Sequence, residues 1–232
     1  MHTPAFLALV RLVVAGDVGE VSRQLRATPA LATMPLPVGA SRHQATDFFF
    51  TDICHYMYGG DTALHMAAAA FSRPTAEVLV SHGADCRAKN RRGAEPLHYA
   101  SDANRSAPLA QAGVIAYLLS IGADPNAVDK SGVAPLHRAV RTRSMAAVRA
   151  LLDGGARPRQ PNTSGSTPLH LAVQTTGRGG SGSETAREQQ ADIIRLLLAH
   201  GARPTDQDGK GRQVQQAATT QWVRTVLMDS AG

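Results

Sequence analysis

Cysteine is scarce in this sequence of 232 residues, and long hydrophobic runs are missing. Two cysteines, Cys54 and Cys86, are too few for a disulfide scaffold. No segment approaches the roughly 18 uninterrupted apolar residues that a membrane helix needs. The apolar start FLALVRLVVAG has Arg11 in its middle, which argues against a signal peptide. We therefore expect a cytoplasmic protein with free thiols and no contact with a membrane.

Lysine is scarce: the chain has 21 arginines but only three lysines, Lys89, Lys130 and Lys210. The net charge of +6 and the isoelectric point of about 9.9 would by themselves suggest an acidic partner such as nucleic acid. Alanine and glycine are also abundant, and GC-rich codons alone would produce the same arginine excess. Composition therefore decides little about partners, although 43% apolar residues predict a substantial core.

Recognisable motifs of catalysis and metal binding are missing as well. The sequence contains no G-x-S-x-G, no paired-carboxylate arrangement and no Cys-His-Asn order. Asp52, Cys54, His55 and Asp61 are metal-compatible residue types, but they lack the C-x-x-C or H-E-x-x-H spacing that would fix a geometry. We expect no enzyme activity, no catalytic residues, no metal and no cofactor.

A tetrad that ends in Leu-His recurs along the chain. It occupies residues 62–65, 95–98, 134–137 and 167–170, with its leucines 33, 39 and 33 residues apart. Each tetrad precedes a downstream glycine, at Gly83, Gly122, Gly155 and Gly201, and apolar residues seven, four and three positions before that glycine form one helical face. Thr-Pro suits the start of a helix and glycine suits its end. Each unit is predicted to be helix, loop, helix and turn.

These motifs resemble the ankyrin repeat, whose unit of about 33 residues carries T-P-L-H-x-A and a trailing G-A-D-x-N. The resemblance covers residues 60 to about 212. It implies an all-α repeat, an α-solenoid of helix pairs joined by β-hairpin-type turns. It also implies that the tetrad histidines hydrogen-bond the backbone near the turns. The sequence departs from the family pattern at Ala63, Glu95, Ala134, Arg157 and Arg203.

One repeat domain is predicted to fill residues 1–232. Its parts are an N-terminal capping helix pair at 1–34, an aromatic-rich insertion at 35–60, repeats at 61–92, 93–131, 132–164 and 165–210, and a C-terminal capping unit at 211–232. The two capping units reproduce the second-helix spacing, and terminal repeats need a polar outer face. Gln215 and Gln216 stand in the last unit where leucine and histidine belong.

Partner specificity is sought in the parts that do not repeat. The insertion holds half of the ten aromatic residues of the chain, namely Phe48, Phe49, Phe50, Tyr56 and Tyr58. Their rings either fill gaps at the end of the stack or form a contact surface for a partner. The second repeat has six extra residues around 101–108, and the fourth has 13, which begin with TGRGGSGS at 176–183.

TGRGGSGS looks like a phosphate-binding loop, but it lacks the G-x-x-x-x-G-K-[ST] pattern and follows a helix instead of a strand. A connector is favoured. Ser181 and Glu184 spell a capping box, which predicts one long second helix from Glu184 to His200. In the alternative, the start of this helix, with Arg178 before it, holds an anion or an acidic group.

Basic residues gather in the third repeat and in the turns. In ankyrin-like arrays the first helix faces the concave groove, so Arg138 and Arg141 are expected there. The residues predicted to contact a partner are Arg87, Lys89, Arg91, Arg92, Tyr99, Asp102, Lys130, Arg138, Arg141, Arg143, Phe48, Phe49, Phe50, Tyr56, Tyr58 and Arg178. The basic ones either form a strip for an acidic partner or reflect only the arginine-rich composition.

The resemblance implies a non-catalytic protein-protein interaction module. We expect a monomeric adaptor or inhibitor that binds an acidic protein partner through the concave face, the turn tips and the insertions. One alternative is nucleic-acid or other polyanion binding through the basic strip, which would show a steep salt dependence. Another is a structural scaffold or assembly subunit. Fold alone does not name the partner.

Overall fold

The computed structural model describes residues 3–41, 46–102, 107–174 and 183–229, and in these ranges the chain is mainly helical. The α-helices are α1 (Thr3–Ala15), α2 (Val18–Ala27), α3 (Ala63–Ala69), α4 (Arg73–Ser81), α5 (Pro96–Asp102), α6 (Pro108–Ser120), α7 (Pro135–Arg141), α8 (Met145–Asp153), α9 (Pro168–Ala172), α10 (Glu184–Ala199), α11 (Val214–Ala217) and α12 (Gln221–Asp229). Short 3-10 helices are η1 (Pro29–Ala32), η2 (Thr46–Phe48) and η3 (Thr51–Ile53). This succession of helix pairs confirms the predicted all-α repeat solenoid.

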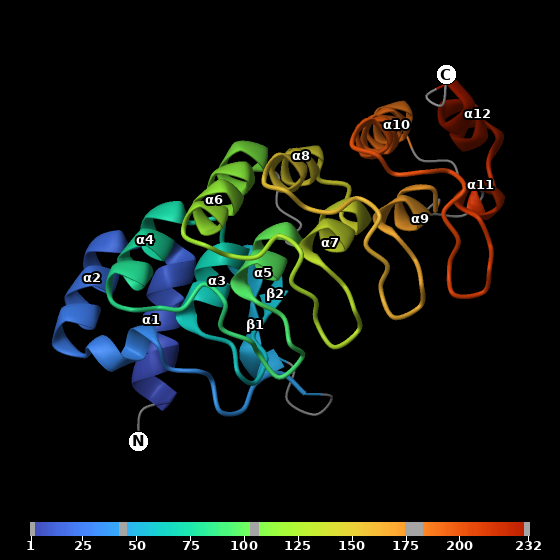
Figure 1. The fold of residues 1–232 in the computed structure, drawn as a ribbon. Coiled ribbons are helices and arrows are strands. Elements are labelled where there is room, and N and C mark those ends of the chain that lie inside the picture. The colour runs from blue at the N-terminus through green and yellow to red at the C-terminus, as the bar shows by residue number, and fades with distance from the viewer. Residues whose placement is uncertain (1–2, 42–45, 103–106, 175–182, 230–232) are drawn as a thin grey trace.

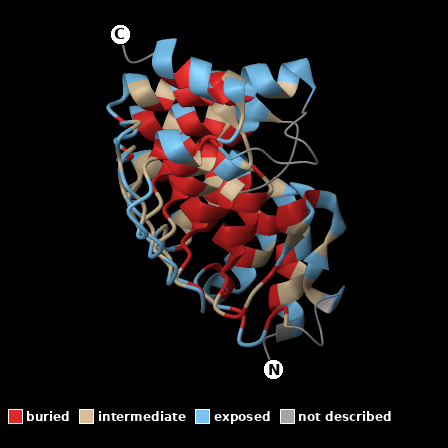
Figure 2. Ribbon diagram, turned by 90° about the vertical axis from the view of Figure 1, so that its right-hand side faces the viewer, coloured by how far each residue is buried: buried red, intermediate tan, exposed pale blue. Residues whose placement is uncertain are grey.

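The helices stack in two rows (Figure 1). The first helices α1, α3, α5, α7 and α9 pack side by side, and α11 continues that row. The second helices α2, α4, α6, α8, α10 and α12 pack in the same way above them. Since neighbouring helices contact each other within the rows and between them, the buried residues form one continuous core along the array (Figure 2).

The core consists of the apolar positions that repeat in the sequence. The tetrad leucines, represented by Leu64, Leu97 and Leu136, are at most 1% exposed. In α8 the predicted apolar face is also buried, at Val148 and Leu151. The face is narrower than predicted in α4, α6 and α10, where the residue three positions before the glycine is only partly buried. The 3.6-residue period therefore predicts correctly which side of these helices faces the core, although it overestimates the width of the buried face in three of them.

Each tetrad histidine links its own helix to the next repeat. In His98, Nδ1 accepts the backbone N–H of Glu95 at 3.1 Å, while Nε2–H donates to the carbonyl of Val133 at 3.0 Å. His65, His137 and His170 do the same, donating to the carbonyls of residues 94, 166 and 212. The predicted backbone-bonding role of these histidines is confirmed. One nitrogen accepts and the other donates, so the ring is neutral.

The loops between repeats share one conformation. An Asn or Asp accepts two backbone N–H groups three residues before each of the repeat-opening glycines Gly93, Gly132, Gly165 and Gly211. In Asp129, Oδ1 accepts those of Ser131 at 2.8 Å and Val133 at 3.1 Å. Adjacent loops also bond to each other, as Lys130 N–H donates to the Arg92 carbonyl at 2.9 Å. Gly132 has a φ of +69°, and a Cβ there would lie 2.6 Å from a backbone nitrogen of the next loop. Only glycine allows the loops to approach this closely.

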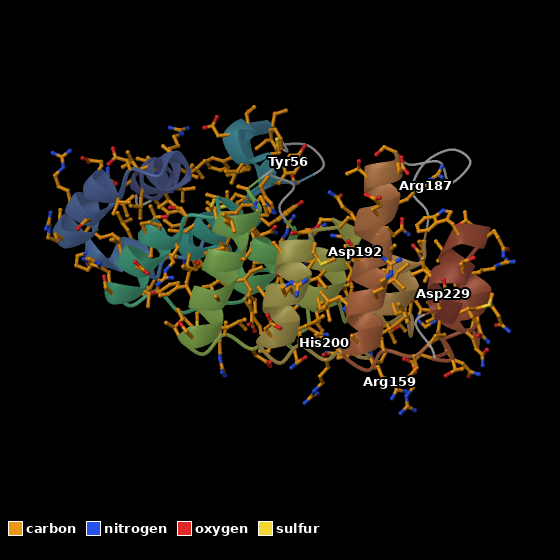
Figure 3. All side chains as sticks on the ribbon, turned by 90° about the horizontal axis from the view of Figure 1, so that it is seen from above. Tyr56, Arg159, Arg187, Asp192, His200 and Asp229 are labelled. Carbon is orange, nitrogen blue, oxygen red and sulfur yellow. The ribbon has the colours of Figure 1, made fainter. Side chains whose placement is uncertain are left out.

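The insertions depart from the regular pattern. Within residues 35–60, β1 (Phe49–Phe50) and β2 (His55–Tyr56) pair antiparallel, which the sequence did not predict. The long helix predicted from Glu184 is confirmed as α10, but its N-cap is Ser183, whose side chain accepts the N–H of Ala186. Ser181 and Arg178 lie outside the described residues. Figure 3 shows Tyr56 and Arg187 on one side of the array and His200 on the opposite side, so the hairpin and the start of α10 project together.

The helices of the described residues include none that is long and apolar enough to cross a membrane.

Replacing Leu136 with alanine should lower the free energy of unfolding by about 2–5 kcal/mol, because its side chain is 1% exposed and its removal leaves a cavity. Urea denaturation measures the change. Leu109→Ala is the matched control: this leucine is 88% exposed, and its loss should change stability by no more than about 0.5 kcal/mol. Equal losses in both variants would show that the core is misplaced.

Stability should decrease as the pH falls from 6.5 to 4, partly through His98. Burial, and after it the charge of Arg138, lowers the pKa of His98 from 6.5 to about 4. The unfolded chain, whose histidine pKa is about 6.5, therefore binds more protons than the folded chain in this window. The neutral folded histidine contributes up to about 3 kcal/mol at pH 7, and this contribution is lost by pH 4.

Urea midpoints of the wild-type protein and of His98→Gln at several pH values test this effect. Glutamine can still donate to the Val133 carbonyl, and Gln216 already occupies the equivalent position in the last unit, where its side chain accepts the N–H of Gln213. The variant should be less stable at pH 7 but lose stability less steeply toward pH 4. Parallel pH profiles would contradict the assignment.

Candidate functional site

The buried carboxylate of Asp61 anchors the aromatic insertion to the repeats. Asp61 is 0% exposed, and its oxygens accept the hydroxyl of Tyr99 at 2.8 Å, the amide of Asn90 at 2.9 Å and the backbone N–H of Tyr58 at 2.5 Å. Burial, and next the negative charge of Asp61, raises the pKa of Tyr99 well above 10, so the hydroxyl remains a donor. The end of the insertion is thereby fixed against α5 and the loop before it.

The insertion has a packed side and an exposed side. Phe48, Phe50 and Tyr58 are partly buried and pack against the core. Phe49 and Tyr56 lie opposite each other in the strand pair, with ring centroids 4.7 Å apart, and are 37% and 38% exposed. The structure thus divides the five rings by exposure: three pack against the core, and two face outward.

A pocket of about 210 Å³, which we call the aromatic pocket, lies between the insertion and the second repeat. The rings of His55 and Tyr99 lie 4.6 Å apart, and the guanidinium of Arg92 lies 4.5 Å from the ring centroid of Tyr58. Tyr99 is 1% exposed, so it contributes little surface to a partner although it belongs to the lining. The lining residues are Cys54, His55, Tyr56, Tyr58, Asn90, Arg92, Ala94, Tyr99, Asp102 and Arg138.

A second pocket of about 500 Å³, the basic pocket, adjoins the first. The two pockets share Arg92, Asp102 and Arg138. The lining of the basic pocket carries more positive than negative charge, and consists of Arg91, Arg92, Asp102, Asp129, Lys130, Ser131, Val133, Arg138 and Arg141. The arrangement is suited to bind anionic groups and offers no nucleophile paired with a base.

Two of the cations in the basic pocket are already paired. Arg138 lies between Asp102, at 3.2 Å, and Asp129, at 3.0 Å, and its side chain is only 11% exposed. This corrects the sequence prediction that Arg138 is displayed in the groove. Arg141 bonds Asp102 at 2.7 Å but is 59% exposed. Burial opposes ionisation of Asp129, but the hydrogen bonds from Arg138 and from backbone N–H groups outweigh it and lower the pKa of Asp129.

The other cations come from the loop tips. The hydrogen bond from Lys130 N–H to the Arg92 carbonyl holds two successive tips together, and the side chains of both residues are exposed. Neither side chain has an acidic partner among the described residues. Arg91 donates from Nη2 to the Ala40 carbonyl at 2.6 Å. Arg92 and Lys130 are therefore the cations most available to a ligand.

The remaining predicted basic residues lie apart from these pockets. Arg87 donates to the Gly122 carbonyl at 2.7 Å, and Lys89 lies 3.7 Å from Glu95. Arg143 has a φ of 56° and lines a separate cavity of about 90 Å³ beside α9 and α10. The predicted contact residues did not include His55, Asn90 and Asp129, which line the two pockets. The loop position of Asn90 and Asp129, three residues before a repeat-opening glycine, is a signal that could have found both.

Two family models match the chain. One, described as ankyrin repeats in three copies, matches residues 106–208, and the single ankyrin repeat matches residues 59–91. The chain belongs to the ankyrin-repeat family. A comparison with curated proteins gave no match.

Ankyrin repeats generally mediate protein-protein interaction, and the family is generally non-catalytic. The matched ranges leave out residues 35–58 and 92–105 of this chain. Most residues that line the aromatic pocket fall in these gaps, among them His55, Tyr58, Arg92 and Asp102. The pocket is thus built mainly from the insertion and from the part of the second repeat that neither family model matches.

Removing the hydroxyl of Tyr99 should loosen the insertion. Tyr99→Phe deletes one donor to the buried Asp61 carboxylate, which should cost about 1.5–3 kcal/mol in urea denaturation and speed hydrogen exchange of the Tyr58 amide. Tyr117→Phe is the control, since this half-buried hydroxyl donates to none of the described residues. Unchanged exchange at Tyr58 in the Tyr99 variant would refute the anchor.

Proposed function

We propose that this ankyrin-repeat protein is a non-catalytic adaptor or inhibitor that binds an acidic segment of a protein partner in the aromatic and basic pockets. It acts as a monomer in the cytoplasm. The observation that carries the proposal is the excess of positive charge around the basic pocket, where Arg92 and Lys130 lack an acidic partner among the described residues.

Charge complementarity explains how such a pocket would select a partner. Cations at the rim of an interface raise the association rate of an acidic ligand and reject basic ones. The loop-to-loop hydrogen bond already holds Arg92 and Lys130 side by side, and Asp102 already orients Arg141. The side chain of Arg141 therefore has less conformational entropy to lose when a carboxylate binds, which favours affinity.

A protein partner fits these features better than a nucleic acid. A polyphosphate chain needs a continuous basic track, but Arg87 and Lys89 lie outside the two pockets and engage groups of the chain itself. Asp102 and Asp129 also line the basic pocket and would oppose a row of phosphates. A compact pocket of about 500 Å³ suits one or two carboxylates. Self-assembly as a scaffold would instead appear as an oligomer in light scattering.

The double substitution Arg92→Glu with Lys130→Glu should reduce capture of the partner from a nuclease-treated native lysate by about tenfold or more, because both changes reverse charge where the acidic segment binds. The control pairs Arg11→Glu with Arg149→Glu, which makes the same charge change on exposed residues of α1 and α8. Equal capture by both double variants, or capture that nuclease treatment abolishes, would exclude the proposed site.

A further inference from the structure

We propose that the bound segment carries an aromatic side chain next to its acidic residues. The ring enters the aromatic pocket, the carboxylates enter the basic pocket, and Asp102 limits the negative charge that the site accepts. The inference rests on the proposed function and specifies the ligand chemistry that the two pockets recognise.

The aromatic pocket presents rings to its contents. The rings of His55, Tyr56 and Tyr58 line it and are at least partly exposed, and the centroids of Tyr56 and Tyr58 lie 6.4 Å apart. The buried ring of Tyr99 packs beside that of His55. Aromatic rings bind one another in offset or edge-to-face arrangements and bury a large area at low entropic cost. The exposed ring of Phe49, 4.7 Å from that of Tyr56, continues the aromatic surface outside the pocket. The pocket, at about 210 Å³, has room for a single side chain of the ligand.

Arg92 joins the two pockets. Its guanidinium carbon lies over the ring of Tyr58, 4.5 Å from the ring centroid, so the cation is held against the ring. A guanidinium packed on a ring still has its N–H donors around its edge, where they suit a carboxylate. None of the described residues accepts these donors. A ligand with a ring on one side of Arg92 and a carboxylate on the other would use both properties at once.

Asp102 competes with the ligand for cations of the basic pocket. Its oxygens bond Arg138 at 3.2 Å and Arg141 at 2.7 Å, and its own side chain is 22% exposed. A ligand carboxylate beside Arg141 therefore meets the charge of Asp102. Asp129 also bonds Arg138, but its Oδ1 accepts two backbone N–H groups and so holds its loop in place. Asp102 is the carboxylate whose charge tunes ligand selection.

Fluorescence anisotropy with labelled peptides of about ten residues tests the proposal at about 50 mM salt. The first peptide has four glutamates flanking a phenylalanine, the second has alanine in place of the phenylalanine, and the third has glutamines in place of the glutamates. A labelled thymidine oligonucleotide of similar length is the fourth probe. The first peptide should bind about tenfold or more tightly than the others.

Variants assign the preference to the pockets. Asp102→Asn should tighten binding of both acidic peptides about threefold to tenfold, because it removes a like charge but keeps a hydrogen-bond acceptor. Asp153→Asn, the same charge change on an exposed residue of α8, should leave affinity unchanged. Tyr56→Ala should reduce the advantage of phenylalanine over alanine, and Arg92→Gln should weaken the acidic peptides. A gain of affinity in Asp102→Asn cannot arise from unfolding.

The outcomes separate this inference from the proposed function. Equal affinity for the phenylalanine and alanine peptides, or no gain in Asp102→Asn, overturns the inference and leaves an acidic protein partner in place. Failure of all three peptides, while charge reversal at Arg92 and Lys130 still abolishes capture from lysate, also overturns only the inference. Tighter binding of the oligonucleotide than of any peptide overturns both.

Discussion

The neutral histidine that links each repeat to the next is the interaction on which the rest of the array depends. It can bridge two repeats only while Nδ1 accepts and Nε2 donates, as in His98 between Glu95 and Val133. In His98, burial lowers the pKa and so keeps the ring in this form. Protonation would add a hydrogen to Nδ1, so two N–H donors would face each other and the contact would break.

The pockets follow from this link, because it fixes where each loop lies. Once successive loops are joined, Arg92 and Lys130 meet at their tips through a backbone hydrogen bond. Asp129 then serves two purposes: Oδ1 closes its loop, and Oδ2 holds Arg138. The geometry of the basic pocket is thus coupled to the stability of the stack, and a change in one loop alters the charge distribution of the site.

The regular part of the fold could be predicted because its causes are local. Helix period, caps and the tetrad histidine all act within one unit or between adjacent units. Even the departure at Gln216 has a local reason. Its side chain accepts the N–H of Gln213 as a histidine would. The described residues contain no further repeat whose carbonyl would accept the second hydrogen bond of a histidine. The Asp61 anchor could not be predicted, because Asn90 and Tyr99 come from 29 and 38 residues away. For the same reason, the spacing of residues in the sequence could not show that Arg138 is paired with Asp102 and Asp129.

The pockets lie at the second repeat because the regular repeats and the insertion contribute different groups there. The scaffold alone supplies rows of helices and bonded loops, which match the family. The insertion adds rings where Asp61 attaches it, close to the first loop tips that carry two adjacent arginines, Arg91 and Arg92. The Asp61 anchor fixes the aromatic surface, and the hydrogen bonds between successive loops fix the cationic surface. The two surfaces therefore meet at one place. A partner therefore meets backbone and rings that are already in place, and only the exposed side chains of Arg92 and Lys130 remain to be ordered on binding.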